Sequence, residues 1–153
     1  MRLRAPREDE AEALGALCLR SKGHWGYDAA FMAACRAELA VAPRALRETW
    51  RWRAAEIDGA LAGVAEIEVE GEAASLERLF VDPPWIGRAG LGRALMDWAA
   101  QAARGAGARW MEIEADPGAE AFYRRMGAAP AGWAPSASIA GRRLPRLRLD
   151  LGV

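Results

Sequence analysis

The sequence predicts a mixed α/β (α+β) fold, in which a mostly antiparallel sheet is flanked by helices. Asp58-Gly59 separates two strand-like runs and is a strong hairpin signal. Residues 91–104 have the apolar spacing of an amphipathic helix. This helix follows a predicted strand at 75–81 and precedes another at 110–115. A strand, helix and strand in this order imply a right-handed crossover between parallel strands.

The first half of the chain contains a short strand, two helices and then further strands. Residues 1–5 are predicted to form the short strand. Residues 8–20 have apolar side chains at spacings of three and four, which predicts a helix. Residues 21–27 contain two glycines and predict a loop. Asp28 is a typical N-cap for a second helix at 29–39. Strands are then expected at 50–57, 61–70 and 75–81.

The second half continues with alternating helices and strands after the long helix. Pro117 opens a short helix at 118–126, which ends at Gly127. Residues 146–151 alternate leucines with charged residues and predict a final half-buried strand. Residues 133–143 are irregular and polar, and they could form a wall of a substrate site or a dimer contact.

Composition argues for a single domain that spans residues 1–153, with no metal, nucleic-acid or membrane partner. The chain has 21 basic and 21 acidic residues, so it lacks the excess of basic residues that favours binding to nucleic acid or to anionic membranes. It has one histidine and two cysteines without zinc spacing, which excludes a multi-histidine metal site. No apolar run is long enough for a membrane span. We expect a soluble, cytoplasmic protein.

A glycine-rich turn joins the predicted strand at 75–81 to the long helix. Gly87, Gly90 and Gly92 lie within six positions, so several N–H groups can point at one spot. The N-terminus of the helix adds unpaired donors and partial positive charge. Arg88 and Arg93 add full charges. The turn is therefore suited to hold a phosphate or a pyrophosphate.

Other glycine-rich phosphate motifs fit this turn poorly. A P-loop would need a lysine after the glycines, and none is present. A dinucleotide fingerprint would place its third glycine where Leu95 stands. A turn that only connects strand to helix remains the alternative.

The turn resembles the acetyl-CoA-binding motif of the GNAT superfamily of N-acetyltransferases, Gln/Arg-x-x-Gly-x-Gly/Ala. Gly90 and Gly92 match its two small positions. A second signature of this family is Asn/Asp-x-x-Ala-x-x-x-Tyr followed by glycine. It is matched by Asp116, Ala119, Tyr123 and Gly127. The order of the elements also agrees, so the similarity covers nearly the whole chain.

The sequence departs from the family pattern at two places. The Gln/Arg position of the first motif falls on Gly87, with Arg88 displaced by one, as if Ala89 were an extra residue in the turn. Asp116 stands where asparagine is commoner, so its side chain can only accept hydrogen bonds.

The resemblance implies acetyl-CoA as a co-substrate and no metal. It places the pantetheine arm along the backbone of residues 79–81, in a gap between two parallel strands that splay apart and end near Val81 and Ala115. The implied contacts with the cofactor are Leu79, Phe80, Val81, Gly87, Arg88, Ala89, Gly90, Leu91, Gly92, Arg93, Asp116, Ala119 and Tyr123.

The resemblance also implies that the amine attacks the thioester directly. The Tyr123 hydroxyl would face the sulfur and donate to the leaving thiolate, whereas the alternative is a core tyrosine that packs beside Phe122. A main-chain N–H near Val81 would hold the oxyanion. Glu77 could act as the base through water because it shares strand parity with Val81, or it could be an exposed strand charge. His24 is a second candidate base, and an amine of low pKa needs none.

His24, Trp25 and Tyr27 form an aromatic loop that could line the acceptor pocket, although Trp25 could simply anchor the loop to the core. The sequence therefore predicts an acetyl-CoA-dependent N-acetyltransferase that acts on a small amine or a peptide amine. The alternatives are a CoA-binding sensor that transfers nothing and an unrelated nucleotide-binding protein. A homodimer is compatible with the sequence.

Overall fold

The computed structural model describes residues 1–152, in which seven strands form one sheet in the order β1-β2-β3-β4-β5-β7-β6. Neighbouring strands are antiparallel except β4 and β5, which are parallel. The fold class and the crossover predicted from the sequence are confirmed. The strands are β1 (Arg2–Arg4), β2 (Trp52–Ile57), β3 (Ala60–Glu70), β4 (Ala73–Val81), β5 (Trp110–Glu114), β6 (Ala129–Pro135) and β7 (Arg143–Asp150). The helices are α1 (Ala11–Gly23), α2 (Ala29–Leu39), α3 (Leu91–Gly105) and α4 (Glu120–Arg125).

Local sequence signals explain several of these boundaries. Asp58 and Gly59 both have positive φ, 51° and 78°, as a two-residue hairpin turn requires. The Asp28 carboxylate accepts a hydrogen bond from the Phe31 N–H and caps α2. The helix α1 runs to Gly23, three residues beyond the predicted end.

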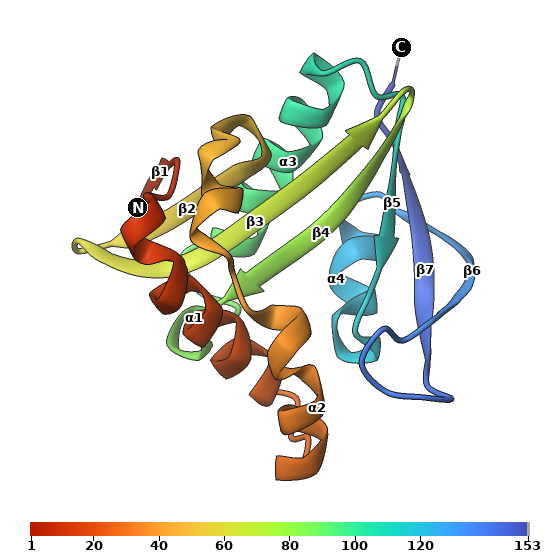
Figure 1. Cartoon of the computed structure of the whole chain (residues 1–153). Coiled ribbons are helices and arrows are strands. Elements are labelled where there is room, and N and C mark those ends of the chain that lie inside the picture. The colour runs from red at the N-terminus through yellow and green to blue at the C-terminus, as the bar shows by residue number, and fades with distance from the viewer. Residues whose placement is uncertain (153) are drawn as a thin grey trace.

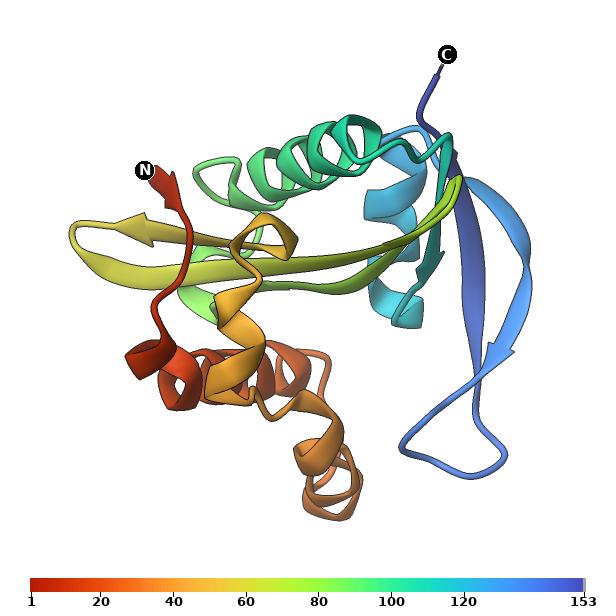
Figure 2. The same cartoon turned by 45° about the horizontal axis from the view of Figure 1, so that its top comes forward.

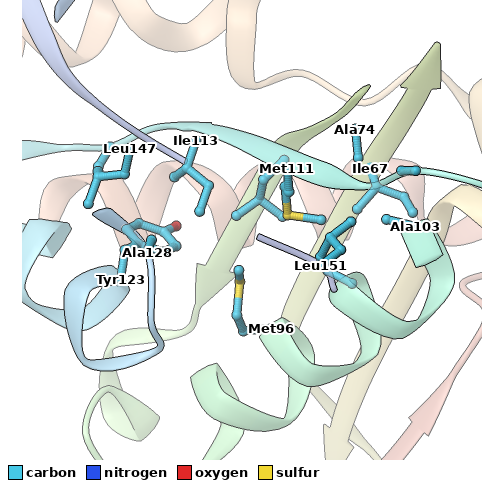
Figure 3. Packing of buried hydrophobic residues seen from close by; sticks show 14 residues of the cluster. Ile67, Ala74, Met96, Ala103, Met111, Ile113, Tyr123, Ala128, Leu147 and Leu151 are labelled. Atoms are coloured by element: carbon cyan, nitrogen blue, oxygen red, sulfur yellow. The ribbon is translucent and has the colours of Figure 1, made fainter. Parts of the chain in front are cut away.

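Helices cover both faces of the sheet. The helix α3 packs on one face of β2, β3 and β4, and α1 and α2 lie on the other face (Figures 1 and 2). Cys18, Cys35 and Trp52 are buried between α1, α2 and the sheet. On the other face, the largest buried cluster joins α3 to β5, α4 and β7, and Figure 3 shows Tyr123 beside Ala128 within it.

A β-bulge interrupts the strand β4 at Glu77. Glu66 of β3 pairs with Arg78, and the next residue of β3 pairs with Leu76, so Glu77 is the extra residue. Leu76 and Leu79 consequently pack into the same buried cluster, although their numbers differ by three. The prediction that Glu77 has the same strand parity as Val81 is therefore wrong, because the bulge at Glu77 reverses the alternation of side chains.

The strand β6 is absent from the sequence prediction, which assigned no element to 129–132 and irregular structure to 133–143. Its sequence contains Pro130, Gly132 and Pro135, which disfavour a central strand. The structure places β6 at the edge of the sheet, paired only with β7, where prolines are tolerated.

Candidate active site

The parallel strands β4 and β5 separate halfway along β4. They pair from Ala73 to Leu76, and β4 then continues to Val81 without β5. The Asp82 N–H donates to the Ala62 carbonyl on the other neighbour, β3. Because successive residues of a strand point their backbone groups to opposite sides, Leu79 and Val81 direct theirs away from β3. These groups therefore form an open strand edge.

A cleft of about 720 Å³ opens beside this edge. Most of the side chains and turns singled out by the sequence line it: Trp25, Glu77, Leu79, Phe80, Val81, Gly87, Arg88, Gly90, Leu91, Gly92, Arg93, Asp116, Ala119 and Tyr123. His24, Tyr27 and Ala89 are absent from its lining. The sequence prediction missed other lining residues, among them Glu38, Arg78 and Leu144.

The turn before α3 gathers main-chain donors at one end of the cleft. Gly87, Ala89 and Gly90 all have positive φ, between 57° and 73°. Within residues 1–152, the first three N–H groups of α3, at positions 91–93, have no hydrogen-bond acceptor. A helix N-terminus with free donors attracts anions. Ala89, the additional residue of the turn, has a left-handed backbone conformation and so helps to form the tight turn.

Gly92 lets α3 approach α4 closely. A Cβ atom at this position would lie 3.2 Å from the Phe122 ring. The two signature motifs are thus in direct contact, and a larger residue at position 92 would have to displace this ring.

Tyr123 lies on α4 at the inner wall of the cleft and is buried, with 7% of its surface exposed. Its ring meets Phe122 edge-on at 5.2 Å. Burial, with a smaller effect from Asp116, raises the pKa of Tyr123 above the ordinary phenol value. The hydroxyl is therefore protonated at neutral pH and can donate a hydrogen bond.

Glu77 projects from the bulge of β4 toward Ser75 and Glu68. Partial burial raises the pKa of Glu77, and the neighbouring Glu68 raises it further, while the Ser75 hydroxyl opposes this effect. A carboxylate with a raised pKa is a better proton acceptor than an ordinary one.

Asp116 gathers three partners from distant parts of the chain, and we call Lys22, Tyr27, Asp116 and Arg142 the Asp116 cluster. One carboxylate oxygen accepts hydrogen bonds from the Tyr27 hydroxyl at 2.7 Å and the Lys22 ammonium at 3.0 Å. The other oxygen accepts from the Gly118 N–H at 3.0 Å. Arg142 donates to the Tyr27 hydroxyl at 2.6 Å and lies 3.6 Å from the carboxylate.

The ionisation of this cluster follows from its contacts. Burial alone would raise the pKa of Asp116, but the hydrogen bonds from Tyr27, Gly118 and Lys22 outweigh it and lower the pKa below its usual value. Burial and the bond to Asp116 raise the pKa of Tyr27 to about 12. The cluster therefore holds an ionised Asp116 and a neutral Tyr27 at neutral pH.

Trp25 seals the loop between α1 and α2 against the turn before α4. A Cβ atom on Gly118 would lie only 2.5 Å from the indole ring, so the ring rests directly on the glycine backbone. His24 is exposed and meets the edge of this indole at 5.2 Å.

Arg78 fixes α2 to β4 beside the bulge. Its guanidinium donates to the carbonyls of Leu39 at 2.6 Å and Ala40 at 3.0 Å, at the end of α2, and to Glu66 at 3.0 Å. These bonds satisfy carbonyls that the helix end leaves free. The end of α2, where Leu39 lines the cleft, is thereby fixed to β4, the strand that carries the open edge.

Neither a metal centre nor a membrane span is found in the part of the chain that the structure describes. Residues 1–152 contain no group of three or more His, Cys, Asp and Glu side chains that could hold a metal ion. Over the same residues, no helix has the length and apolar character needed to cross a bilayer.

Several solved structures share the fold of this chain. A PaiA N-acetyltransferase from Thermoplasma acidophilum, in complex with coenzyme A, has a TM-score of 0.78 at 16% identity over 97% of this chain and 98% of its own. A GCN5-related N-acetyltransferase from Rhodopseudomonas palustris has a TM-score of 0.75 at 19% identity over 97% and 94%. The ribosomal-protein-S18-alanine N-acetyltransferase from Escherichia coli has a TM-score of 0.70 at 18% identity over 99% and 94%.

Sequence comparison reaches the same family. No curated protein sequence matches the chain. The model of the acetyltransferase (GNAT) domain matches residues 47–127, which is more than half of the chain and includes the open strand edge, the donor turn and Tyr123. The chain therefore belongs to the GNAT family and is an acetyl-CoA-dependent acyltransferase.

Proposed function

We propose that the protein transfers the acetyl group of acetyl-CoA directly to a primary amine while both substrates are bound. The observation that carries the proposal is the open edge of β4 beyond Leu76, which continues into the donor turn before α3. The diphosphate of the cofactor would bind the free N–H groups of the turn, and the pantetheine arm would pair with Leu79 and Val81 as an added strand.

Residues around this edge can meet the chemical needs of the transfer. The neutral amine attacks the thioester carbon, and a main-chain N–H such as that of Val81 stabilises the oxyanion. When the carbon–sulfur bond breaks, the Tyr123 hydroxyl donates its proton to the thiolate. Glu77 receives, through water, the proton that the amine must lose. Ala89 extends the donor turn without contacting the cofactor through its side chain.

The acceptor is a small amine or a peptide amine. One protein of similar fold is a ribosomal-protein-S18-alanine N-acetyltransferase, which makes a peptide amine a reasonable first choice for testing. The aromatic side chains of His24, Trp25 and Tyr27 belong to the loop beside the remaining part of the cleft, and Trp25 is the one among them that reaches its lining.

The test is a thiol-release assay over a panel of small amines and peptides, with melting curves in acetyl-CoA and in CoA. We expect stabilisation by both cofactors and thiol release with at least one amine. Stabilisation without release on any amine would instead indicate a CoA-binding sensor. Stabilisation by ATP or NAD and not by CoA would contradict both.

Initial-rate kinetics distinguish direct transfer from an acyl-enzyme. Cys35 is a buried thiol that lines the cleft, so it is the cysteine on which an acyl-enzyme would form. We expect intersecting double-reciprocal lines and a Cys35→Ser variant that keeps its turnover. Parallel lines, together with an acetylated Cys35 in the mass spectrum, would contradict direct attack.

A further inference from the structure

The carboxylate of Asp116 is held by hydrogen bonds from the protein itself. Both of its oxygens accept hydrogen bonds, one from Gly118 and the other from Tyr27 and Lys22. The family motif suggested that this side chain contacts the cofactor. In this chain the oxygen that accepts from Tyr27 and Lys22 also lies 3.6 Å from the Arg142 guanidinium, so neighbouring protein groups already compensate the charge of the carboxylate.

The charges of the Asp116 cluster are largely shielded from water. Side-chain exposure is 11% for Asp116, 15% for Lys22 and 18% for Arg142. Charges in such surroundings are costly unless they are paired and hydrogen-bonded. Each member therefore depends on the others, and the cluster acts as one unit.

Three segments distant in sequence meet at this unit. Lys22 and Tyr27 belong to the end of α1 and the loop after it, Asp116 follows β5, and Arg142 lies in the loop between β6 and β7. The Tyr27 ring stacks on Phe31 at 3.9 Å, which extends the contact into α2. Further along, Ser138 of the β6–β7 loop hydrogen-bonds to Glu38 of α2.

The segments held by the cluster line the part of the cleft that the cofactor leaves free. The donor turn and the edge of β4 account for the diphosphate and the pantetheine arm. The remaining lining includes Lys22, Trp25, Glu38 and Leu144, which come from the segments that the cluster and its neighbouring contacts hold. The acceptor must enter here to reach the thioester.

We propose that the Asp116 cluster positions the wall against which the acceptor binds, so that Asp116 controls acceptor binding and not acetyl-CoA binding. This inference rests on the proposed function. Asp116 is a positioning residue in this account: it orders the loop after α1 and the β6–β7 loop and touches neither substrate.

The first test is Tyr27→Phe, which removes the bridging hydroxyl and retains the ring that stacks on Phe31. Loss of hydrogen bonds to charged groups predicts a KM for the acceptor raised by about tenfold. We expect kcat and the Kd of acetyl-CoA, measured by calorimetry, to stay within about twofold. Tyr123→Phe is the matched control, because it removes the other phenol of the chain and should lower kcat instead.

The second test is hydrogen exchange in Asp116→Asn, which needs no amine substrate. Amides of residues 24–28 and 136–142 should exchange about tenfold faster than in the parent protein, while those of α3 should not change. This readout and the calorimetric Kd decide the inference even if no amine is acetylated, an outcome that would overturn the proposed function alone.

The opposite pattern would overturn the inference. If Tyr27→Phe and Asp116→Asn weaken acetyl-CoA binding while acceptor KM and loop exchange stay unchanged, Asp116 acts on the cofactor. Should Asp116→Asn fail to fold, Tyr27→Phe still decides between the two, since it changes one oxygen atom.

Discussion

Main-chain N–H groups of the turn before α3 form one part of the cleft, whereas another part depends on the Asp116 cluster, which joins side chains from three distant segments and contributes Asp116 and Lys22 to the lining. At the turn before α3, the donors belong to the backbone, and the side chains need only leave room for them. At the Asp116 cluster, each contact depends on a particular side chain. A site made of backbone tolerates sequence change as long as its conformation persists, whereas a site made of side chains is altered by single substitutions.

The largest effect is expected from replacing Tyr123, the proposed proton donor. Tyr123→Phe removes the proton donor without changing the packing of the ring, so kcat should fall by about 100-fold or more. The Kd of acetyl-CoA should not change, because neither end of the cleft is altered. Steady-state rates and calorimetry on the same preparation check both statements, and an unchanged rate would remove Tyr123 from the mechanism.

Gly92→Val is the most direct way to break the main-chain end. A Cβ atom at this position would lie 3.2 Å from the Phe122 ring, so the larger side chain must displace the ring and disturb the donor turn. We expect acetyl-CoA to bind about 50-fold more weakly, by calorimetry, in a protein that keeps its circular dichroism spectrum.

Gly105→Val is the matched control on the same helix. A Cβ there meets nothing within 4 Å. Valine is a better helix former than glycine, so this variant should lose no stability from helix propensity and should retain its affinity. Equal losses of affinity in the two variants would show that the effect comes from the helix and not from the turn.

The buried ion pair between Arg4 and Glu10 lies outside the cleft and serves as a comparison for the Asp116 cluster. Arg4 donates to both oxygens of Glu10, at 2.8 and 2.7 Å, just before α1 begins. These bonds are the main reason that the pKa of Glu10 falls to about 2. Glu10→Gln should lower the free energy of unfolding by about 2 kcal/mol at pH 7. The KM for the acceptor should not change, because the Asp116 cluster lies at the other end of α1.

The pH dependence of that variant follows from the lowered pKa. The contribution of Glu10 is fully present above its unfolded value, near 4.5, and is lost as the pH falls toward about 2. Denaturation at several pH values should show the parent and the variant converging over this range. A constant difference between pH 5 and pH 2 would contradict the assignment.

Arg88→Met and Arg93→Met give the smallest expected effect. Both side chains are exposed beside the donor turn, so each should contribute only a few-fold in acetyl-CoA affinity at low salt. The difference should shrink at high ionic strength because exposed charges are screened. A large effect that resists salt would mean that side chains, and not the backbone, hold the diphosphate.

The strand, the turn and the helix at the main-chain end were predicted from the sequence because these elements are local. A strand, a glycine-rich turn and a helix follow one another between residues 75 and 104. The donors of this turn are backbone N–H groups, so their direction depends on the backbone conformation. That conformation can be predicted from the local sequence pattern. The hairpin at Asp58-Gly59 and the capped start of α2 were predicted for the same reason.

The side-chain end was not predicted because its members are far apart. Tyr27 and Arg142 are separated by 115 residues, and no local period relates them. The bulge at Glu77 was missed since the register of a strand depends on its partner. The strand β6 was missed because its prolines and glycine are read as loop signals, and only its edge position permits them.

The edge position of β6 also bears on self-association. Two prolines and a register shift between Pro130 and Trp133 are features that blunt a sheet border against the addition of a foreign strand. The opposite border, β1, is only three residues long. One border is interrupted and the other is short, and both features disfavour a continuous intermolecular sheet between two copies of this protein.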